Sequence, residues 1–289
     1  MTASIQKSFK SQKASGKLFL VPTPIGNMQD MTLRALETLK TVELIAAEDT
    51  RNTQKLLNHF DIKVGQESFH EHNAKEKIPK LLDILKSGRS IAQVSDAGMP
   101  SISDPGQDLV KAAIQEDIDV VALPGPSAGI TALIASGLVP QPHIFYGFLP
   151  RKASEQKKFF ESKRYYPETQ IFYESPFRLG DTLKNMQAIY GDREAVLVRE
   201  LTKIYEEYRR GSISALIESL STDLVKGECL LIVSGFSGEV PNMEEEALSP
   251  LEEVQSKIDA GMKPNQAIKE VAKKRDLVRQ ELYQAYHDL

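Results

Sequence analysis

Short apolar runs alternate with helical patterns along the first half of the chain, and this alternation limits the folds open to it. Residues 18–21 (LFLV) are typical of a buried strand, and from about Thr32 leucines recur on one side of a helix. The same alternation places further strands at 43–47, 91–94 and 118–123, and helices at 50–59, 75–86 and 104–115. It predicts an α/β domain with a largely parallel sheet.

A second α/β unit is expected after a join near 124–128. Its apolar runs predict strands at 144–147, 169–173, 195–199, 205–210 and 228–234. The strands near Ala195 and Tyr205 have no helix between them, so this sheet is expected to be mixed. The resulting division is a flexible leader at 1–16, an N-terminal α/β domain at 17–126, a C-terminal α/β domain at 127–236, an acidic linker at 237–249 and a helical tail at 250–289.

The helical tail contains three short helical patterns. Apolar residues at 251, 254 and 258 form one stripe, Pro264 opens a second helix, and a third follows a break near Asp276. Short helices, a basic second helix and a tight turn are typical of a helix-turn-helix unit. A helical cap on the second domain, or a contact between copies of the chain, would explain the same pattern.

The composition of the 289 residues is that of a globular protein, with 41% apolar and 26% charged residues. No apolar run approaches the roughly 18 residues that a membrane helix needs, and residues 1–16 lack the apolar core of a secretory signal. The single cysteine, Cys229, excludes an internal disulfide and a cysteine-built zinc site, and it lies in an apolar run. We therefore expect a cytoplasmic protein with a buried thiol.

The net charge of −4 counts against a protein that grips nucleic acid over its whole surface. Local basic surfaces remain compatible with that charge. Two clusters are present: Arg151, Lys152, Lys157, Lys158, Lys163 and Arg164, and then Lys263, Lys269, Lys273, Lys274, Arg275 and Arg279. Either cluster alone is more typical of a solvated helix face.

Four loops follow predicted strands and have unusual compositions: 22–30, 46–51, 94–106 and 123–128. In open α/β sheets, ligands bind beyond the carboxyl ends of the strands, where such loops converge. The loop at 46–51 holds Glu48, Asp49 and Arg51, whose charges would point into that cleft. The structural alternative is that Asp49 caps a helix and Arg51 is its surface partner.

The third and fourth loops are rich in small residues and prolines, which let a backbone approach a ligand closely. In the third, Asp104 is expected to cap the following helix, so Asp96 is the better functional candidate. In the fourth, Ser127 and Ala128 open a helix and leave N–H donors to which a carboxylate or a ribose can dock.

Two further polar clusters have both a functional and a structural interpretation. His70 and His72 share a face if they lie on a strand; acid–base work or phosphate contact is favoured over metal binding, and no metal site is expected. Plain surface polarity is the alternative. In the second half, charged residues follow two strands, and salt bridges among them would explain their presence: Glu174, Arg178, Arg199 and Glu200.

Taken in order, these segments resemble the tetrapyrrole-methylase superfamily of methyltransferases. The matched motifs are TPIGN at 23–27, AEDTR at 47–51, HEHN at 70–73, SDAG at 95–98, PGPSA at 124–128, GFLPR at 147–151, YESP at 173–176 and RELTK at 199–203. The resemblance covers roughly 17–235, and the tail also resembles a small C-terminal unit found in the family. One motif alone is weak, whereas the ordered set is specific. Met99 and Phe177 depart from the pattern, which usually has Thr and commonly His there.

The resemblance implies a homodimer that binds S-adenosylmethionine between the two α/β domains. It implies cofactor contacts from the loop residues Gly98, Ser101, Ile102, Ser127, Ala128, Tyr173, Leu201 and Gly227, to which the first and third loops add Pro24 and Asp96. It also implies the reaction, which is 2′-O-methylation of a cytidine in the 16S RNA of the small ribosomal subunit.

Such a reaction needs a group that takes the proton of the ribose hydroxyl. The candidates, in order, are Glu48 or Asp49, then His72, then Lys203, while Arg51, Arg178 and Lys203 can position phosphates. The alternatives are a methyltransferase for a tetrapyrrole or a protein side chain, and a non-catalytic RNA binder in ribosome assembly. The charged clusters and the basic tail favour RNA, and the intact cofactor loops favour an enzyme.

Overall fold

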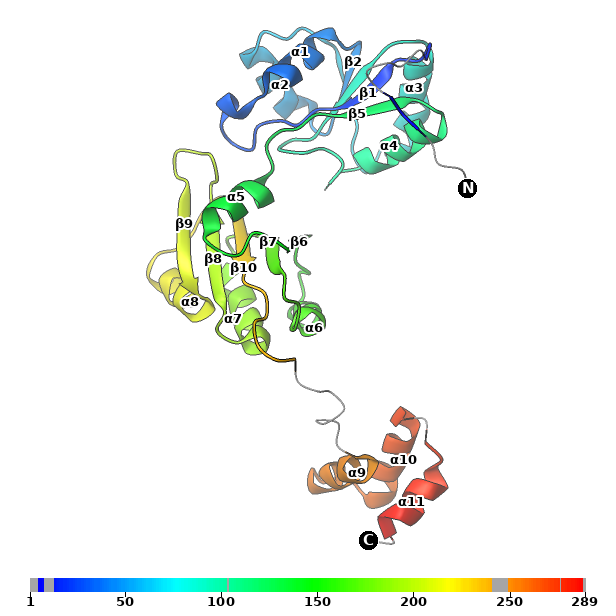
Figure 1. The fold of residues 1–289 in the computed structure, drawn as a ribbon, viewed down its shortest axis with the longest axis vertical. Coiled ribbons are helices and arrows are strands. Elements are labelled where there is room, and N and C mark those ends of the chain that lie inside the picture. The colour runs from blue at the N-terminus through cyan, green and yellow to red at the C-terminus, as the bar shows by residue number, and fades with distance from the viewer. Residues whose placement is uncertain (1–4, 8–12, 103, 241–248, 276, 288–289) are drawn as a thin grey trace. The chain divides into compact units, whose positions relative to one another are not determined.

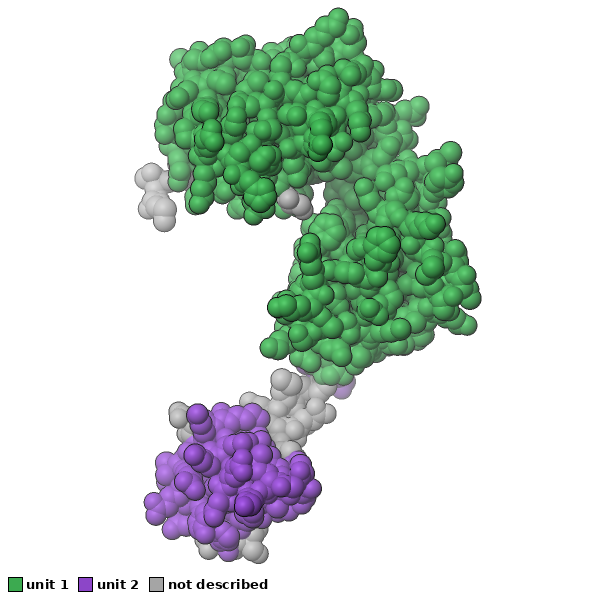
Figure 2. Space-filling model, turned by 180° about the vertical axis from the view of Figure 1, so that it is seen from behind, with its two compact units in different colours: residues 1–236 green, residues 237–289 purple. Residues whose placement is uncertain are grey.

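The computed structural model describes residues 5–7, 13–102, 104–240, 249–275 and 277–287. The chain divides into two compact units, residues 1–236 and 237–289, which Figure 2 colours green and purple. Most of the expected acidic linker, residues 241–248, lies outside the described residues, as does much of the expected leader.

The first half of unit 1 is a five-stranded sheet in the order β3-β2-β4-β1-β5 (Figure 1). All four neighbouring pairs are parallel, which confirms the parallel sheet expected from the alternating pattern. The strands are β1 (Lys17–Leu20), β2 (Leu44–Ala47), β3 (Gln66–Ser68), β4 (Ile91–Val94) and β5 (Asp119–Ala122). The sequence did not indicate β3, because its three residues, Gln-Glu-Ser, carry no apolar pattern.

Helices cover both faces of this sheet, as a buried parallel sheet requires. One face packs against α1 (Leu33–Thr41) and α2 (Thr50–His59), through side chains such as Leu39 and Leu57. The other face packs against α3 (Ala74–Lys86) and α4 (Gly106–Gln115), through Leu85 and Leu109. A single 3₁₀ turn, Met28–Asp30, follows β1.

The second half of unit 1 is a five-stranded sheet that is mixed, as expected. Its strand order is β6-β7-β10-β8-β9. The β6–β7 pair is parallel, and β10 runs antiparallel to both of its neighbours. The strands are β6 (His143–Phe148), β7 (Thr169–Glu174), β8 (Glu194–Arg199), β9 (Glu207–Ser212) and β10 (Cys229–Val233). Cys229 is buried on β10, and burial raises the pKa of its thiol to about 11.

The two faces of the mixed sheet are covered unequally. Three helices pack on one face: α6 (Ala153–Lys163), α7 (Leu179–Tyr190) and α8 (Ile213–Thr222). On the other face, α5 (Ala128–Ser136) packs Ala132 and Leu133 against the apolar strand residues. Because α5 begins directly after the loop that follows β5, it carries the chain from the first sheet to the second.

Unit 2 is a small helical bundle of α9 (Pro250–Asp259), α10 (Pro264–Arg275) and α11 (Arg279–His287). Its core contains Val254, Ile268, Val271 and Leu282. Ser249 opens α9 with a capping box, in which its hydroxyl and the Glu252 carboxylate each accept the other residue's backbone N–H.

Parts of the leader contact the edge strand β5. The Gln6 amide both donates to Val120 O and accepts from Val120 N, which mimics one step of strand pairing. Lys13 lies 2.8 Å from the Asp117 carboxylate and 2.9 Å from that of Asp119. The sequence alone did not indicate these contacts.

Candidate active site

The carboxyl ends of β1, β2 and β4 meet at one edge of the first sheet, because the three strands are parallel neighbours. The loop after β1 is joined to the loop after β4 by two backbone hydrogen bonds between Thr23 and Gly98, at 3.0 and 3.1 Å. The buried Thr23 hydroxyl also donates to Ser95 O at 3.1 Å. The first and third candidate loops therefore form one surface.

The loops after β2 and β4 are joined through carboxylates. The backbone N–H of Asp96 donates to the Glu48 carboxylate at 3.3 Å, and that of Asp49 donates to the Asp96 carboxylate at 3.0 Å. Asn52 Nδ2 donates to the second Asp96 oxygen at 3.1 Å. Asp96, favoured as a functional residue because no structural role was evident, thus has one: it holds two strand ends together.

Glu48 has the electrostatics of a proton acceptor. Burial raises the pKa of its carboxyl, and repulsion from the carboxylates of Asp96, Asp104 and Asp49 raises it further, against the hydrogen bond from Asp96 N–H. A base whose pKa lies closer to neutral pH is better matched to general base catalysis.

Asp49 has the opposite environment. It is the N-cap of α2, and it accepts hydrogen bonds from the backbone N–H, Nε and Nη2 of Arg51 at 2.7–3.0 Å. These bonds with Arg51 lower the pKa of Asp49 to about 2. The structural alternative considered for Asp49 is therefore the one present, although Arg51 remains 86% exposed and accessible to a ligand.

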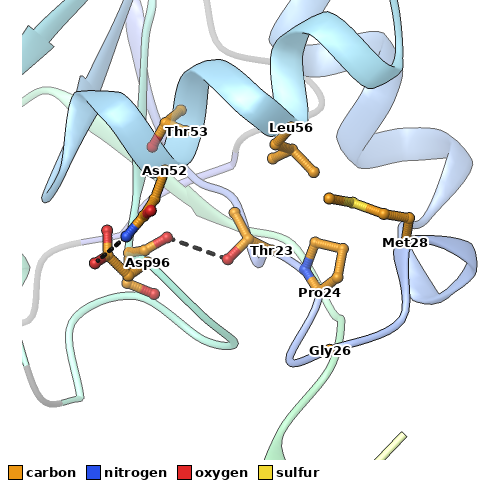
Figure 3. Close-up of a pocket in the computed structure, with 9 residues that line it drawn as sticks. Thr23, Pro24, Gly26, Met28, Asn52, Thr53, Leu56 and Asp96 are labelled. Carbon is orange, nitrogen blue, oxygen red and sulfur yellow. Dashed lines mark hydrogen bonds between the residues drawn. The ribbon is translucent and has the colours of Figure 1, made fainter. Parts of the chain in front are cut away.

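A cavity of about 130 Å³ opens beside Asp96. Figure 3 shows Thr23, Pro24 and Gly26 on one side, Asn52, Thr53 and Leu56 of α2 on the other, and Asp96 at one end. Pro24 was expected at the site, whereas Asn52 and Met28 were not. The position of Asn52, one residue beyond the charged motif and on the first turn of α2, was the one available signal.

The loop after β4 is held by left-handed residues and by hydrogen bonds to Asp104. Gly98 and Ser101 both have left-handed backbones, with φ of 78° and 69°. The Asp104 carboxylate accepts from Ser101 N and Gly106 N at 2.8 Å, and from the buried Gln93 amide at 2.9 Å. Asp104 thus binds the first N–H of α4, although the N-cap residue of that helix is Pro105, and it also orders the loop. Ile102, on the same loop, is exposed.

The loop after β5 passes close to the loop after β1. A Cβ at Gly125 would lie 2.6 Å from the Pro22 ring, so only glycine fits there. Ser127 is the N-cap of α5 and its side chain makes no capping hydrogen bond. Beside it, a second cavity of about 260 Å³ is lined by Ile25, Asp30, Thr32, Gly125, Pro126, Thr131 and Thr202.

Three of the expected cofactor residues lie together on one face of the second sheet. Ala128, Tyr173 and Leu201 are half-buried and pack against the same apolar cluster. Burial raises the pKa of the Tyr173 hydroxyl, which is also hydrogen-bonded to the backbone of Gly129. This arrangement provides an apolar floor with a polar edge.

Leu201 lies in a turn with unusual backbone angles. Glu200 and Thr202, on either side of it, are left-handed with φ of 48° and 67°. The Glu200 carboxylate accepts from Glu228 N at 2.9 Å, and Gly227, with φ of 89°, passes so close to it that a Cβ would overlap the carboxylate. Gly227 is therefore brought next to the Leu201 turn.

Lys203 connects this turn to the first domain. Its Nζ lies 3.0 Å from Glu200 and 3.2 Å from Glu228. Burial lowers the pKa of the ammonium, but the hydrogen bonds with the two carboxylates outweigh it and leave the pKa raised. Its side chain packs on Gly26, where a Cβ would lie 2.5 Å from Lys203 Cγ. A raised pKa argues against Lys203 as a base.

The histidine pair does not lie on a strand, so the condition for a shared strand face is not met. β3 ends at Ser68, and His70 and His72 lie in the turn that leads to α3. Their rings are nevertheless 5.9 Å apart, because the turn folds back through hydrogen bonds from His70 N to Asn73 Oδ1 and from Asn73 Nδ2 to Ser68 O. His72 is exposed.

The Glu174 and Arg178 charges have the structural role proposed as their alternative. The buried Glu174 carboxylate accepts from Arg178 Nε at 2.7 Å, Arg178 Nη2 at 2.9 Å, Thr182 Oγ1 at 2.8 Å and Ser175 N at 2.7 Å. Arg178 Nη2 also donates to Leu149 O. The Arg178 guanidinium therefore stabilises the fold through these hydrogen bonds instead of binding a phosphate.

The fold is that of an α/β protein built on two sheets. We name as the cradle its closely approaching backbones at Gly98 and Gly125, the start of α5 at Ser127, which has no side-chain cap, and the residues Tyr173 and Leu201, which pack on an apolar cluster of the second sheet. These features fit S-adenosylmethionine, whose carboxylate, ribose and adenine need such surroundings. Among the described residues, no group of three or more metal-binding side chains occurs.

Comparison with known proteins agrees with this class. The family described as Tetrapyrrole (Corrin/Porphyrin) Methylases matches residues 17–217. Proteins named Ribosomal RNA small subunit methyltransferase I are similar over the full length: that of Streptococcus pyogenes serotype M3 is 68% identical, covering 99% of both chains, and that of Bacillus subtilis is 49% identical, covering 98% of both. The crystal structure of diphthine synthase shares the fold, with a TM-score of 0.61 at 14% identity, covering 76% of this chain and 90% of that one.

The chain therefore belongs to the tetrapyrrole-methylase family, and it is a methyltransferase that uses S-adenosylmethionine. No helix in the described part of the chain is both long enough and apolar enough to cross a membrane.

Proposed function

We propose that this methyltransferase acts on the 16S RNA of the small ribosomal subunit and methylates the 2′-oxygen of a cytidine. The observation that carries the substrate is the full-length similarity to relatives named for that RNA, which includes the helical unit beyond the family match. The choice of a ribose oxygen is supported by the half-buried Glu48, which is hydrogen-bonded to Asp96 of the cavity in Figure 3, since a ribose hydroxyl must lose its proton as it reacts.

S-adenosylmethionine, when bound, supplies an activated methyl group. The residues proposed to hold it are those of the cradle and its neighbours: Pro24, Asp96, Gly98, Ser101, Ile102, Ser127, Ala128, Tyr173, Leu201 and Gly227. Glu48 is proposed to accept the hydroxyl proton, because its pKa is raised while that of Asp49 is lowered. Asp49 is proposed to orient Arg51 toward the RNA backbone, and the Lys203 ammonium, already paired with two carboxylates, to position the turn at Leu201.

His72 is the remaining candidate for contact with the substrate. It is exposed and follows β3, the neighbour of β2, so it lies at the same edge of the first sheet as Glu48. We propose a phosphate contact rather than proton transfer, because the partly buried Glu48 is the better placed base.

Two basic surfaces are proposed to bind RNA around the target. On α6, the exposed Lys157 and Lys158 have no ion pair among the described residues. In unit 2, the exposed Lys263, Lys269 and Lys273 likewise have none there, whereas Lys274 and Arg275 pair with Glu253. Because α10 is followed directly by the short connection at 276–278 and by α11, we propose that this tail is a helix-turn-helix unit that contacts RNA.

A homodimer is proposed as the active assembly. In support, the outer side of α5 exposes Ile130 and Ile134, one helical turn apart, on a helix that is apolar on all sides. Light scattering coupled to size exclusion measures the mass of the species, and a monomer at micromolar concentration would contradict this proposal.

The decisive test is methyl transfer to subunits that lack the modification. The full chain is incubated with methyl-labelled S-adenosylmethionine and small subunits from a strain without this gene, and the label is mapped by nuclease digestion and mass spectrometry. Label on a cytidine 2′-oxygen is expected with wild type and not with Glu48→Gln. Label on a base instead would contradict the ribose assignment, and no label despite cofactor binding would favour a tetrapyrrole, a protein side chain or a purely binding role.

A further inference from the structure

Four large apolar side chains are exposed in loops or strand ends of the second sheet, away from any core. Phe177 is 96% exposed, Ile204 90%, Phe148 69% and Tyr205 68%. Single exposed apolar residues are common on protein surfaces, but gathered aromatic ones mark interaction sites. The site described above makes no use of them.

The strand register places all four at the same edge of the sheet. Phe148, the last residue of β6, pairs with Tyr173 near the end of β7, and Phe177 follows β7 by three residues. Cys229 at the start of β10 pairs with Glu174 at the end of β7 and with Arg199 at the end of β8. Ile204 and Tyr205 lie at the turn between β8 and β9, which projects beyond this edge (Figure 1).

This edge also carries the proposed cofactor floor. Phe148 contacts Tyr173 edge-to-face with ring centres 5.4 Å apart, and Tyr205 follows Leu201 and Lys203 in the same turn. Lys203 packs on Gly26, which lines the cavity of Figure 3. The exposed rings therefore border the region that the reacting nucleotide must enter.

The turn that carries Tyr205 is held in one conformation. Thr202 N donates to the Glu206 carboxylate at 2.6 Å, and backbone bonds run from Lys203 N to Glu200 O and from Glu206 N to Lys203 O. Glu200 and Thr202 have left-handed backbones, which cost free energy and persist where the surroundings enforce them. Such a fixed turn presents Tyr205 without a large loss of entropy on binding.

Two cations at this edge are free of ion pairs among the described residues and can meet RNA phosphates. Arg151, shortly after Phe148, and Lys226, before β10, are exposed and have no ion pair among the described residues. The carboxylates of Glu200 and Glu228 are paired with Lys203, and that of Glu206 accepts from Thr202. Aromatic rings between cations are the usual platform for unpaired nucleotides, whose bases stack while their phosphates meet the cations.

We propose that Phe148, Phe177 and Tyr205 form a stacking platform for unpaired RNA bases that flank the methylated nucleotide. The proposal rests on the proposed function, because it takes the acceptor to be RNA. Strand spacing sets the reach of the platform: β6 and β8 are separated by three strand spacings, or about 14 Å. That span allows the rings to hold different bases on either side of a nucleotide drawn into the site.

The test compares substitutions in the full chain. Tyr205→Ala and Phe177→Ala remove a ring, Tyr205→Phe keeps it, and Val139→Ala changes an exposed apolar residue that precedes β6 at the opposite edge. The measurements are KM and kcat on unmethylated small subunits, the Kd for a fluorescent ten-nucleotide oligocytidine, the Kd for S-adenosylmethionine, and the molecular mass. Circular dichroism verifies that each variant is folded.

Each alanine substitution is expected to raise the oligocytidine Kd and the KM by about 5- to 150-fold, the range that base–aromatic stacking produces. Tyr205→Phe and Val139→Ala should stay near wild type, and cofactor affinity should not change. An unchanged Kd and KM in folded alanine variants would overturn the proposal, as would a loss of self-association with RNA binding intact, which would assign these rings to a contact between copies.

The same data separate this proposal from the proposed function. If wild type fails to methylate the subunit RNA while oligocytidine binding still depends on Tyr205, the stacking of RNA bases on these rings is supported and the assignment of the subunit RNA as substrate fails. If wild type methylates the RNA and the alanine variants match it, the function stands and the platform fails.

Discussion

Glu48 accepts a hydrogen bond from the backbone N–H of Asp96 at 3.3 Å, which ties the end of β2 to the end of β4. The bond joins the Glu48 carboxylate to Asp96, which lines the cavity of Figure 3, while burial and three neighbouring carboxylates raise the pKa of Glu48. Glu48 is therefore the proposed base, and its ionised form also destabilises the folded protein. Kinetics measures the first effect and thermal unfolding measures the second.

Glu48→Gln is expected to lower kcat by about 100-fold or more, the contribution of general base catalysis, and to leave the Kd for S-adenosylmethionine unchanged. The amide oxygen can still accept from Asp96, so the loop should keep its shape. In wild type, the acidic limb of the kcat/KM profile should lie above the ordinary pKa of a glutamate, which is 4.5. A variant with wild-type turnover would remove Glu48 from the reaction.

The same substitution is expected to stabilise the protein at neutral and alkaline pH. Folding raises the pKa of Glu48, so the protonated carboxyl favours the folded state. This contribution to stability is complete below a pH of about 4.5 and is lost as the pH rises through the higher pKa of the folded protein. Glutamine does not ionise and avoids this loss. The melting temperatures of the two proteins should agree near pH 4 and diverge at pH 8, with the variant higher; equal values at both would contradict the raised pKa.

The ion pair of Asp49 with Arg51 should make stability depend on pH in the opposite direction. The bonds with Arg51 lower the pKa of Asp49 from 3.8 to about 2, so the stability they contribute is present above about pH 4 and is lost as the pH falls toward 2. Asn remains a good N-cap, so Asp49→Asn should keep most activity at pH 7 and flatten the acid unfolding curve. Loss of turnover as severe as in Glu48→Gln would instead make Asp49 the base.

The loops at the ends of β1, β2, β4 and β5 were predictable, because apolar runs ended there in prolines, glycines or charges. The sequence could not rank Glu48 above Asp49, since the pKa of Glu48 is raised first by burial and then by Asp96 and Asp104, which are distant along the chain. The left-handed backbones of Glu200 and Thr202 were equally hidden, because neither is a residue type that favours that conformation. The sequence left open whether the histidines lie on a strand, because β3 is short and polar.

Glu174 and Arg178 are expected to act on stability rather than on chemistry. Glu174→Ala should reduce the free energy of unfolding by about 3–5 kcal/mol, since it leaves the Arg178 guanidinium without its partner in a largely buried network. Urea titration of Glu174→Ala, Arg178→Met and the double variant gives the coupling between them. Additive effects would show that the pair does not interact, and a selective loss of kcat with stability intact would return Arg178 to the site.

Gly227 tests the turn that brings the cofactor residues together. Gly227→Ala must adopt a left-handed backbone, at a cost of roughly 1–2 kcal/mol, and its Cβ would also displace the Glu200 carboxylate that pairs with Lys203. Gly137→Ala is the matched control, because Gly137 has a left-handed backbone with a φ of 88° and nothing within 4 Å of an added Cβ. Both variants should lose similar stability from backbone strain. Only Gly227→Ala should also raise the Kd for S-adenosylmethionine, by about 10-fold or more. Calorimetry measures this as a loss of roughly 1.4 kcal/mol in binding free energy. Equal cofactor affinity in the two variants would place Gly227 and the Leu201 turn outside the cofactor site.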